Sequence, residues 1–314
     1  MKKLMVIATL ALTTQAFAGI DGIYGSDDRK DVYQVSNTLH RTLAKSTAGM
    51  IHGSFFVKGA APNTFDLKGT RTLGAAQNLC SGEKFAEQQI APNCSGFLVG
   101  PDTLVTAGHC YKAIGKLTPE QVCQSFAWVF DYEQKSATSD PTKNIPITNI
   151  YTCRAVLGSQ WDNNYDWSVI KLDRKVVGRT PLKFRAAGKI ADSAKLVVIG
   201  QPNGLPTKIS ANGKITLNSE VSRFSTNLDT FHGNSGSAVF DANTGLVEGI
   251  LIMGKNDYVP SIKGNPKSCQ VVNRCDDNAN NCLGGVEGGT VLKGEVVLRI
   301  QPLAALIQKA LLIK

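Results

Sequence analysis

The chain of 314 residues lacks the features of membrane-spanning, nucleotide-binding and nucleic-acid-binding proteins. After the first residues, no apolar run is long enough to cross a bilayer as a helix. Helices of roughly ten or more residues do not alternate with the apolar segments, which excludes a Rossmann-like sheet. Basic residues are scattered and form no dense patch interleaved with aromatic side chains, which argues against a nucleic-acid partner. The formal net charge of +9 allows only a weak attraction to anionic cell surfaces.

The first residues have the pattern of a secretory signal peptide. Two lysines precede an apolar run from Leu4 to Leu12, and Ala16-Phe17-Ala18 matches an Ala-x-Ala cleavage site. The apolar run is too short to span a bilayer in the mature protein. We therefore expect residues 1–18 to be removed and the protein to be secreted or periplasmic.

The cysteine content agrees with export. The chain contains eight cysteines, an even number, which in an exported protein favours disulfide bonds over metal or redox chemistry. They are Cys80, Cys94, Cys110, Cys123, Cys153, Cys269, Cys275 and Cys282. The sequence by itself does not decide how they pair.

Short runs of β-branched and aromatic residues, separated by Gly, Pro and Asn, begin at about Met50. Such a series of short strands predicts an all-β barrel or sandwich. Asp241–Gly245 lies between two apolar runs and is typical of a hairpin loop. Pro302–Ile313 has proline in its first turn and apolar residues at helical spacing, which predicts a C-terminal helix over residues 302–314.

Two polar segments flank this region. Residues 19–49 begin with few apolar residues and are expected to form an N-terminal arm or a propeptide. Residues 263–289 are rich in Gly, Asn and Asp and carry three cysteines, which predicts a disulfide-stapled surface loop. Within this loop Asp276, Asn278, Asn280 and Glu287 have the spacing of a calcium loop, but the usual glycine and flanking helices are missing. We therefore favour a polar loop over a calcium site.

Three distant segments carry the residue types needed for nucleophilic catalysis. Ser235 lies in Phe231–Ser237, and a serine hydroxyl needs a general base to accept its proton as it attacks. His109, in Val105–Cys110, can be that base, and Asp166 can hold its ring in the correct tautomer. The chain order is therefore His, Asp, Ser.

Each of these residues also has a simpler interpretation. A Gly/Ser turn between strands would account for Ser235, and a buried core histidine for His109. Asp162 lies four residues before Asp166 and is an alternative partner for the histidine. Asp166 is preferred because it immediately precedes the apolar strand that follows.

The motifs resemble those of the trypsin/chymotrypsin-like serine proteases. Cys94–Val99 and Val105–Cys110 resemble the histidine block of that superfamily, and Asp166–Ile170 its aspartate block. Gly200–Pro206 and Gly233–Ser237 are similar to the bacterial branch that includes the glutamyl endopeptidases. The resemblance implies a disulfide between Cys94 and Cys110, which leaves several pairings open for the other six cysteines.

The same resemblance implies two six-stranded antiparallel β-barrels followed by the C-terminal helix. Residues 50–187 would form the first barrel and supply His109 and Asp166, whereas residues 188–301 would form the second and supply Ser235. The active site would lie in the cleft between the barrels.

The backbone N–H groups of Gly233 and Ser235 are expected to stabilise the oxyanion, because glycine can adopt the backbone conformation required there. Ser237 replaces the second glycine of a Gly-x-Ser-x-Gly elbow, so an α/β-hydrolase is not expected. With one of the four histidines assigned to catalysis, no convincing zinc ligand set remains, and we expect neither a metal nor a cofactor.

The residues that would select the substrate are less clearly marked. Asp229 lies six residues before Ser235, where trypsin-like enzymes keep the carboxylate that pairs with Lys or Arg; the alternative is that it only supports its own loop. His232 is expected at the mouth of the specificity pocket. The strand Gly249–Gly254 contains no histidine, which argues against glutamyl specificity. Ile252 replaces a usual serine there, but the backbone from Ile252 to Gly254 can still pair with an extended substrate.

Asn234 precedes the serine where trypsin-like zymogens carry an aspartate, so activation through a buried N-terminal salt bridge is not expected. The sequence predicts a monomeric serine endopeptidase that acts on proteins or peptides. The alternatives are a non-catalytic binding protein on the same fold and an esterase that uses the same triad.

Overall fold

The structure of the protein is a computed structural model that describes residues 22–112, 114–254, 256–283 and 294–313. The expected signal peptide over residues 1–18 and Glu287 of the weak calcium pattern lie outside the described residues. None of the described helices is both long and apolar enough to cross a membrane.

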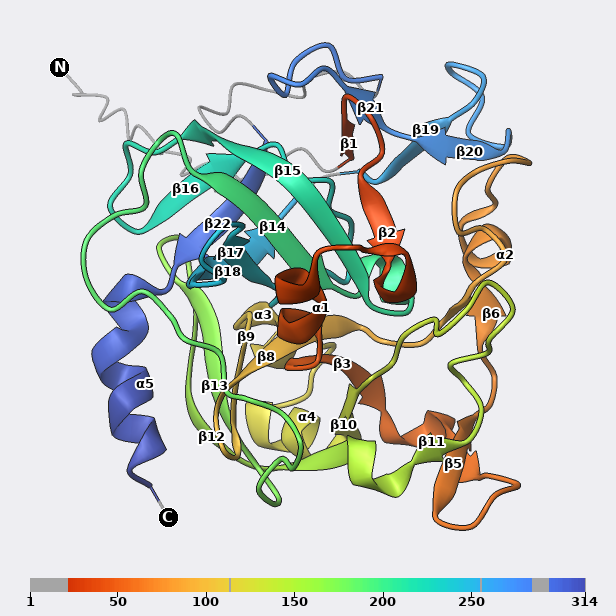
Figure 1. The fold of residues 1–314 in the computed structure, drawn as a ribbon. Helices are drawn as coiled ribbons and strands as arrows, with labels where there is room; N and C mark the ends of the chain where they lie inside the picture. The colour runs from red at the N-terminus through yellow and green to blue at the C-terminus, as the bar shows by residue number, and fades with distance from the viewer. Residues whose placement is uncertain (1–21, 113, 255, 284–293, 314) are drawn as a thin grey trace, which may run out of the picture.

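Two closed antiparallel barrels lie one above the other in Figure 1. The strand order in the first barrel is β10-β12-β13-β9-β8-β3. Its strands are β3 (Thr47–His52), β8 (Cys94–Gly100), β9 (Thr103–Thr106), β10 (Phe126–Phe130), β12 (Ile150–Trp161) and β13 (Asp166–Leu172). The first strand begins before the expected start at Met50.

The second barrel is closed by a pairing between β14 and β15, and its strand order is β14-β17-β18-β22-β16-β15. Its strands are β14 (Lys195–Gly200), β15 (Lys208–Leu217), β16 (Arg223–Thr226), β17 (Ala238–Asp241), β18 (Val247–Met253) and β22 (Glu295–Arg299). A further strand, β2 (Arg29–Asp31), is added to β15 on the outside of this ring. The predicted pair of six-stranded barrels is confirmed, and so is the hairpin between β17 and β18.

Shorter elements connect and cover the barrels. The remaining strands are β1 (Ile23–Tyr24), β4 (Phe56–Lys58), β5 (Thr64–Leu67), β6 (Arg71–Thr72), β7 (Gln89–Ile90), β11 (Ile145–Pro146), β19 (Tyr258–Pro260), β20 (Gln270–Val272) and β21 (Arg274–Cys275). The α-helices are α1 (Thr38–Ala44), α2 (Leu73–Gln77), α3 (His109–Lys112), α4 (Pro119–Ser125) and α5 (Ala304–Leu311). The 3-10 helices are η1 (Val32–Gln34), η2 (Gly53–Phe55), η3 (Ile147–Asn149), η4 (Pro202–Gly204) and η5 (Gln301–Leu303). The predicted C-terminal helix is therefore present, as η5 followed by α5.

One hydrophobic core cluster runs through both barrels and the C-terminal helix. It includes Trp128 of the first barrel, Ile250 of the second and Ile307 of α5, all fully buried. Gly96 leaves room for the Trp128 ring, because a Cβ atom at this position would lie 2.7 Å from the ring. The shared core therefore fixes the two barrels against one another, and with them the segments that lie between the barrels.

The eight cysteines form four disulfide bonds. They are Cys80–Cys269, Cys94–Cys110, Cys123–Cys153 and Cys275–Cys282. The pairing implied by the family resemblance is confirmed. The bond from Cys80 joins two segments that are 189 residues apart, and the last bond closes the predicted polar loop.

Candidate active site

His109 and Asp166 meet where two paired strands of the first barrel end and begin. The pairing of Ser168 with Thr106 brings the end of β9 next to the start of β13. One carboxylate oxygen of Asp166 lies 2.7 Å from Nδ1 of His109, and the other accepts the backbone N–H of His109 at 2.8 Å. The aspartate thus fixes both the ring and the backbone of the histidine.

Asp162, the alternative partner, is used within its own loop. Its Oδ1 accepts the backbone N–H groups of Asn164 and Tyr165, and its Oδ2 accepts the side-chain amide of Gln160. These hydrogen bonds lower the pKa of the Asp162 carboxyl. The structure therefore pairs Asp166, and not Asp162, with the histidine.

The position before the histidine, Gly108, has no room for a side chain. A Cβ atom there would lie 2.0 Å from the carbonyl oxygen of Gln160 and 2.8 Å from the backbone nitrogen of Trp167. Real Cβ atoms do not approach backbone atoms so closely. The glycine therefore lets the chain pass directly against β12 and β13 and enter α3 at His109.

The segment that carries Ser235 is built from two consecutive tight turns. Asn234 N–H donates to the carbonyl of Phe231 at 3.0 Å, and Ser237 N–H donates to the carbonyl of Asn234 at 2.8 Å. Gly233 and Gly236 have φ values of +86° and +87°, which glycine adopts without strain.

The backbone N–H groups of this segment are almost all used. His232 donates to Asp257, and Gly236 donates to the carbonyl of Leu251. Together with the two turns, these bonds leave two N–H groups between residues 232 and 237 without an acceptor in the described part of the chain. They belong to Gly233 and Ser235, the two predicted oxyanion donors.

Ser95, on β8 of the first barrel, holds this segment in place, a role that was not predicted from the sequence. Its backbone N–H donates to the carbonyl of Ser235 at 2.9 Å. Its hydroxyl donates to the carbonyl of Gly233 at 2.8 Å and accepts the N–H of Gln201 at 2.9 Å. Ser95 is fully buried, so each of these bonds is made away from water.

The disulfide Cys94–Cys110 lies between the histidine and the serine. A ring nitrogen of His109 lies within 4.8 Å of both sulfur atoms, and the Cys110 sulfur lies 3.8 Å from the carbonyl oxygen of Ser235. Ser235 Oγ makes no hydrogen bond to His109 within the described residues. Such catalytic hydrogen bonds are often long before substrate binds.

The remaining predicted site residues surround the serine in different ways. His232 is exposed, and desolvation together with the nearby His109 lowers its pKa. Ile252 is buried in β18, which is tied to the serine segment because Leu251 N–H donates to the carbonyl of Ser237 at 2.9 Å. Gly254 directly follows this strand.

Both carboxylate oxygens of Asp229 are occupied by backbone N–H groups of the N-terminal segment. Its two carboxylate oxygens accept the backbone N–H groups of Tyr24 and Asp28, at 2.8 and 2.7 Å. It is 3% exposed, and this burial raises its pKa to about 7, although the two N–H groups act in the opposite direction. The carboxylate thus holds the distant segment Tyr24–Asp28, a role that neither expectation for this residue included.

Neither sulfur atom beside His109 can act as a metal-binding thiolate, because both are joined in the disulfide. Asp276, of the weak calcium pattern, uses one oxygen for the N–H groups of Asn278 and Asn280 and the other for the side chain of Asn281. These bonds lower the pKa of its carboxyl and match those of a polar loop.

Comparison with known proteins shows the family of the chain. Residues 94–250, half of the chain, match the trypsin-like peptidase domain family. The chain therefore belongs to the trypsin-like peptidases, as its motifs indicated.

The individual proteins that match this chain have low sequence identity to it. A glutamyl endopeptidase of Bacillus licheniformis is 26% identical over 161 residues, which cover 48% of this chain and 46% of that protein. The match thus spans less than half of the relative's length. A solved structure of a Glu endopeptidase in complex with MPD is 15% identical, covers 92% of this chain and 99% of its own, and has a TM-score of 0.46. The serine endoprotease from Yersinia pestis is 12% identical, with coverages of 88% and 68% and a TM-score of 0.45.

Proposed function

We propose that the protein is a secreted serine endopeptidase with a catalytic triad of Ser235, His109 and Asp166. Its membership of the trypsin-like peptidases supports the class of reaction. The observation that carries the proposal concerns the N–H groups of residues 232–237: those of Gly233 and Ser235 have no acceptor among the described residues, whereas the other four are bonded. Donors kept free in this way can bind an oxyanion as it forms.

In the first half of the reaction, Ser235 Oγ attacks the carbonyl carbon of the peptide bond while His109 accepts the hydroxyl proton. Asp166 stabilises the imidazolium that results, through the 2.7 Å contact with Nδ1. The carbonyl oxygen becomes an oxyanion and accepts hydrogen bonds from Gly233 and Ser235, and one such donor contributes about 3 kcal/mol.

In the second half, His109 gives the proton to the leaving amine as the C–N bond breaks, which leaves an acyl group on Ser235. A water molecule, deprotonated by the same histidine, attacks the ester, and the serine takes its proton back as the acid product departs. No cofactor enters either half.

The substrate is proposed to be an extended protein or peptide segment bound by a monomer. The backbone from Ile252 to Gly254 would pair with it as an added strand, next to the serine segment. His232, exposed beside Gly233, would border the side chain that precedes the scissile bond. The Bacillus relative is named a glutamyl endopeptidase, but β18 of this chain carries no histidine, so we do not extend that preference to it.

Labelling with a fluorophosphonate probe tests the proposal. We expect one probe per molecule on Ser235 and none on Ser235→Ala, together with turnover of a peptide amide. A folded protein that is not labelled would contradict the proposal and favour a binding protein on the same fold. Labelling with ester turnover but no amide turnover would favour an esterase.

A further inference from the structure

The segment Gly22–Asp31, the N-terminal arm, lies along the second barrel and not apart from it (Figure 1). β1 pairs in parallel with β21, and β2 pairs with the start of β15. Immediately before β1, Gly22 forms an antiparallel bridge with Thr230. The arm therefore contacts the segment that leads to Gly233 and Ser235.

Asp229 is the point around which the arm folds. It accepts N–H groups from Tyr24 and Asp28, so the loop between β1 and β2 closes around one carboxylate. The Tyr24 hydroxyl donates to one oxygen of the buried Glu295 at 2.8 Å, and the Thr230 hydroxyl donates to the other. Arm and segment thus share two buried carboxylates.

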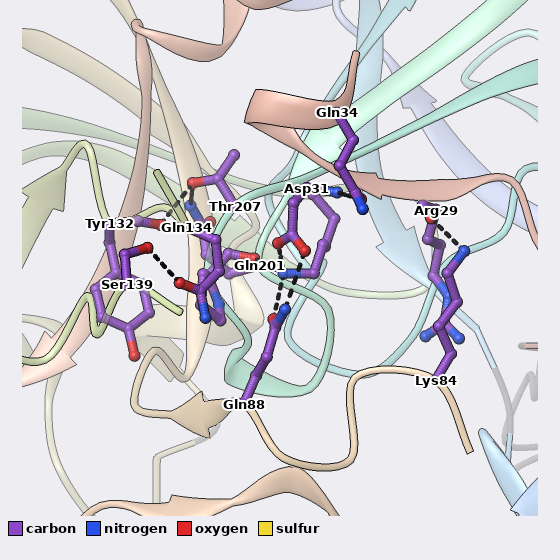
Figure 2. Close-up of polar contacts among 12 residues, drawn as sticks. Arg29, Asp31, Gln34, Lys84, Gln88, Tyr132, Gln134, Ser139, Gln201 and Thr207 are labelled. Carbon is purple, nitrogen blue, oxygen red and sulfur yellow. Dashed lines mark hydrogen bonds and ion pairs between the residues drawn. The ribbon is translucent and has the colours of Figure 1, made fainter. Parts of the chain in front are cut away.

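Arg29 adds a contact between the arm and Phe231, the residue after Thr230. Its guanidinium lies 4.0 Å from the centre of the Phe231 ring, and the side chain is 1% exposed. Asp27 neutralises it through two hydrogen bonds, at 3.0 and 2.8 Å. Figure 2 shows Lys84 beside Arg29, where its ammonium group donates to the Arg29 carbonyl.

The arm is itself firmly held at its far end. Asp31 accepts the buried ammonium group of Lys208 at 2.6 Å. It also accepts the side-chain amide of Gln88 at 3.0 Å, as Figure 2 shows. The contacts therefore pass from a fixed end at Asp31, through Arg29 and the β1–β2 loop, to Asp229, Thr230 and Phe231.

The residue next to the serine does not supply such a connection. Asn234, where a trypsin-type zymogen needs a carboxylate, accepts the Ser237 hydroxyl at 3.3 Å within its own turn. Asparagine carries no charge to pair with a new N-terminal amine. The segment before Gly233 is held from the arm instead.

We propose that the N-terminal arm is a positioning element of the active site, with Asp229 as its anchor and Arg29 as its second contact. By fixing Asp229–Phe231, it holds the Gly233 N–H in the direction of the oxyanion. This inference rests on the proposed peptidase function. Asp229 and Arg29 contact neither the substrate nor the reacting atoms in this scheme.

The test compares Asp229→Asn with the wild-type chain at pH 8. Asparagine keeps one acceptor oxygen but presents an amide to the second N–H, so one of the two arm contacts is lost. We expect kcat to fall about tenfold or more with KM changed less than about twofold, because oxyanion donors act in the transition state. A peptide boronate that mimics the tetrahedral intermediate should bind weaker by a similar factor.

Glu248→Gln is the matched control. Glu248 is 2% exposed, lies in the same barrel and pairs with Arg185, away from the arm contacts. This variant should lower thermal stability while the labelled molecules keep the wild-type kcat. Arg29→Lys, which keeps the charge and loses the flat contact with Phe231, gives a second reading if Asp229→Asn does not fold.

Fluorophosphonate titration counts the competent molecules in each preparation, so kcat is given per labelled serine. The inference is overturned if Asp229→Asn keeps the wild-type kcat, whether or not its KM rises. If Asp229→Asn does not fold, the same outcome in Arg29→Lys overturns it. A loss of kcat equal to that in Glu248→Gln also overturns it. If the wild-type chain itself is not labelled at Ser235, the result overturns the proposed function and not only the role of the arm.

Discussion

The backbone N–H of Ser95 donates to the carbonyl oxygen of Ser235 at 2.9 Å, and so joins the first barrel directly to the proposed nucleophile of the second. The Ser95 hydroxyl adds a bond to the Gly233 carbonyl at 2.8 Å. Cys94, the neighbour of Ser95, is disulfide-bonded to Cys110, which adjoins His109. The position of one barrel relative to the other therefore sets the distance between base and nucleophile.

Replacing Ser95 by alanine should weaken both stability and catalysis. The backbone bond to Ser235 remains, but the Gly233 carbonyl and the Gln201 N–H lose a buried partner, at about 1–3 kcal/mol for each unpaired group. The Gly233–Asn234 peptide, which connects the two proposed donor residues, then keeps only its bond from the Asn234 N–H to Phe231. Both donors should be less well oriented, so kcat should fall about tenfold while KM changes little. Urea unfolding and steady-state kinetics measure the two effects.

Ser46→Ala is the control for this variant. The Ser46 hydroxyl donates to the Thr180 carbonyl at 2.7 Å and is also buried, but it does not contact the serine segment. It should lose stability without loss of kcat. If both variants keep the wild-type kcat, the hydroxyl of Ser95 only supports the fold.

The two candidate partners of His109, Asp166 and Asp162, allow a matched comparison. Asp166→Asn should lower kcat by about 10⁴-fold with the fold intact, because an amide at that position favours the wrong histidine tautomer. Asp162→Asn should retain most of the activity, since Asp162 binds Gln160, Asn164 and Tyr165 and not the histidine. Equal losses in the two variants would show that Asp166 has no special role.

Gly233→Ala separates backbone strain from steric exclusion. Its φ of +86° would strain an alanine, and a Cβ atom would lie 2.8 Å from the Gln201 carbonyl oxygen. Gly188 has a φ of +73° but open space around the position of a Cβ. Gly188→Ala should therefore cost only the strain of roughly 1–2 kcal/mol and keep full activity.

In Gly233→Ala we expect a larger loss of stability and loss of most peptidase activity, because the backbone must move and carries the oxyanion donor with it. Denaturant midpoints and kcat/KM measure both. An active Gly233→Ala enzyme would mean that the Gly233 N–H does not serve the oxyanion.

The sequence predicted the parts of this molecule that depend on local pattern. The proposed triad of His109, Asp166 and Ser235 was predicted from local motifs, and two of its members lie near glycines that the backbone requires, Gly108 and Gly233. The barrels followed from many short strands, which the pairing confirms.

Contacts between distant segments could not be predicted in this way. Ser95 looks like any polar residue at a strand end, and its role appears only when β8 is placed against the serine segment. Asp229 lies where a substrate-reading carboxylate was expected, but its use depends on Tyr24 and Asp28, about 200 residues away in the chain. The disulfide between Cys80 and Cys269 likewise joins segments far apart in the chain, so the local sequence could not predict it.

The raised pKa of Asp229 predicts how stability depends on pH. Burial raises it to about 7, whereas an unfolded aspartate titrates at about 3.9. Between these values the folded state keeps a proton that the unfolded state has lost, so this group stabilises the fold most below pH 4. Its contribution is lost as the pH rises to 7.

The difference in unfolding free energy between the wild type and Asp229→Asn isolates this group, because the other titrations cancel. Relative to Asp229→Asn, the wild type should lose about 1.4 kcal/mol of unfolding free energy for each pH unit from pH 4 to 7. Above pH 7 the difference should stay constant. Urea unfolding at each pH gives the two curves. A difference that is flat from pH 5 to 8 would mean that Asp229 ionises normally, with the Tyr24 and Asp28 N–H groups offsetting the whole effect of its burial.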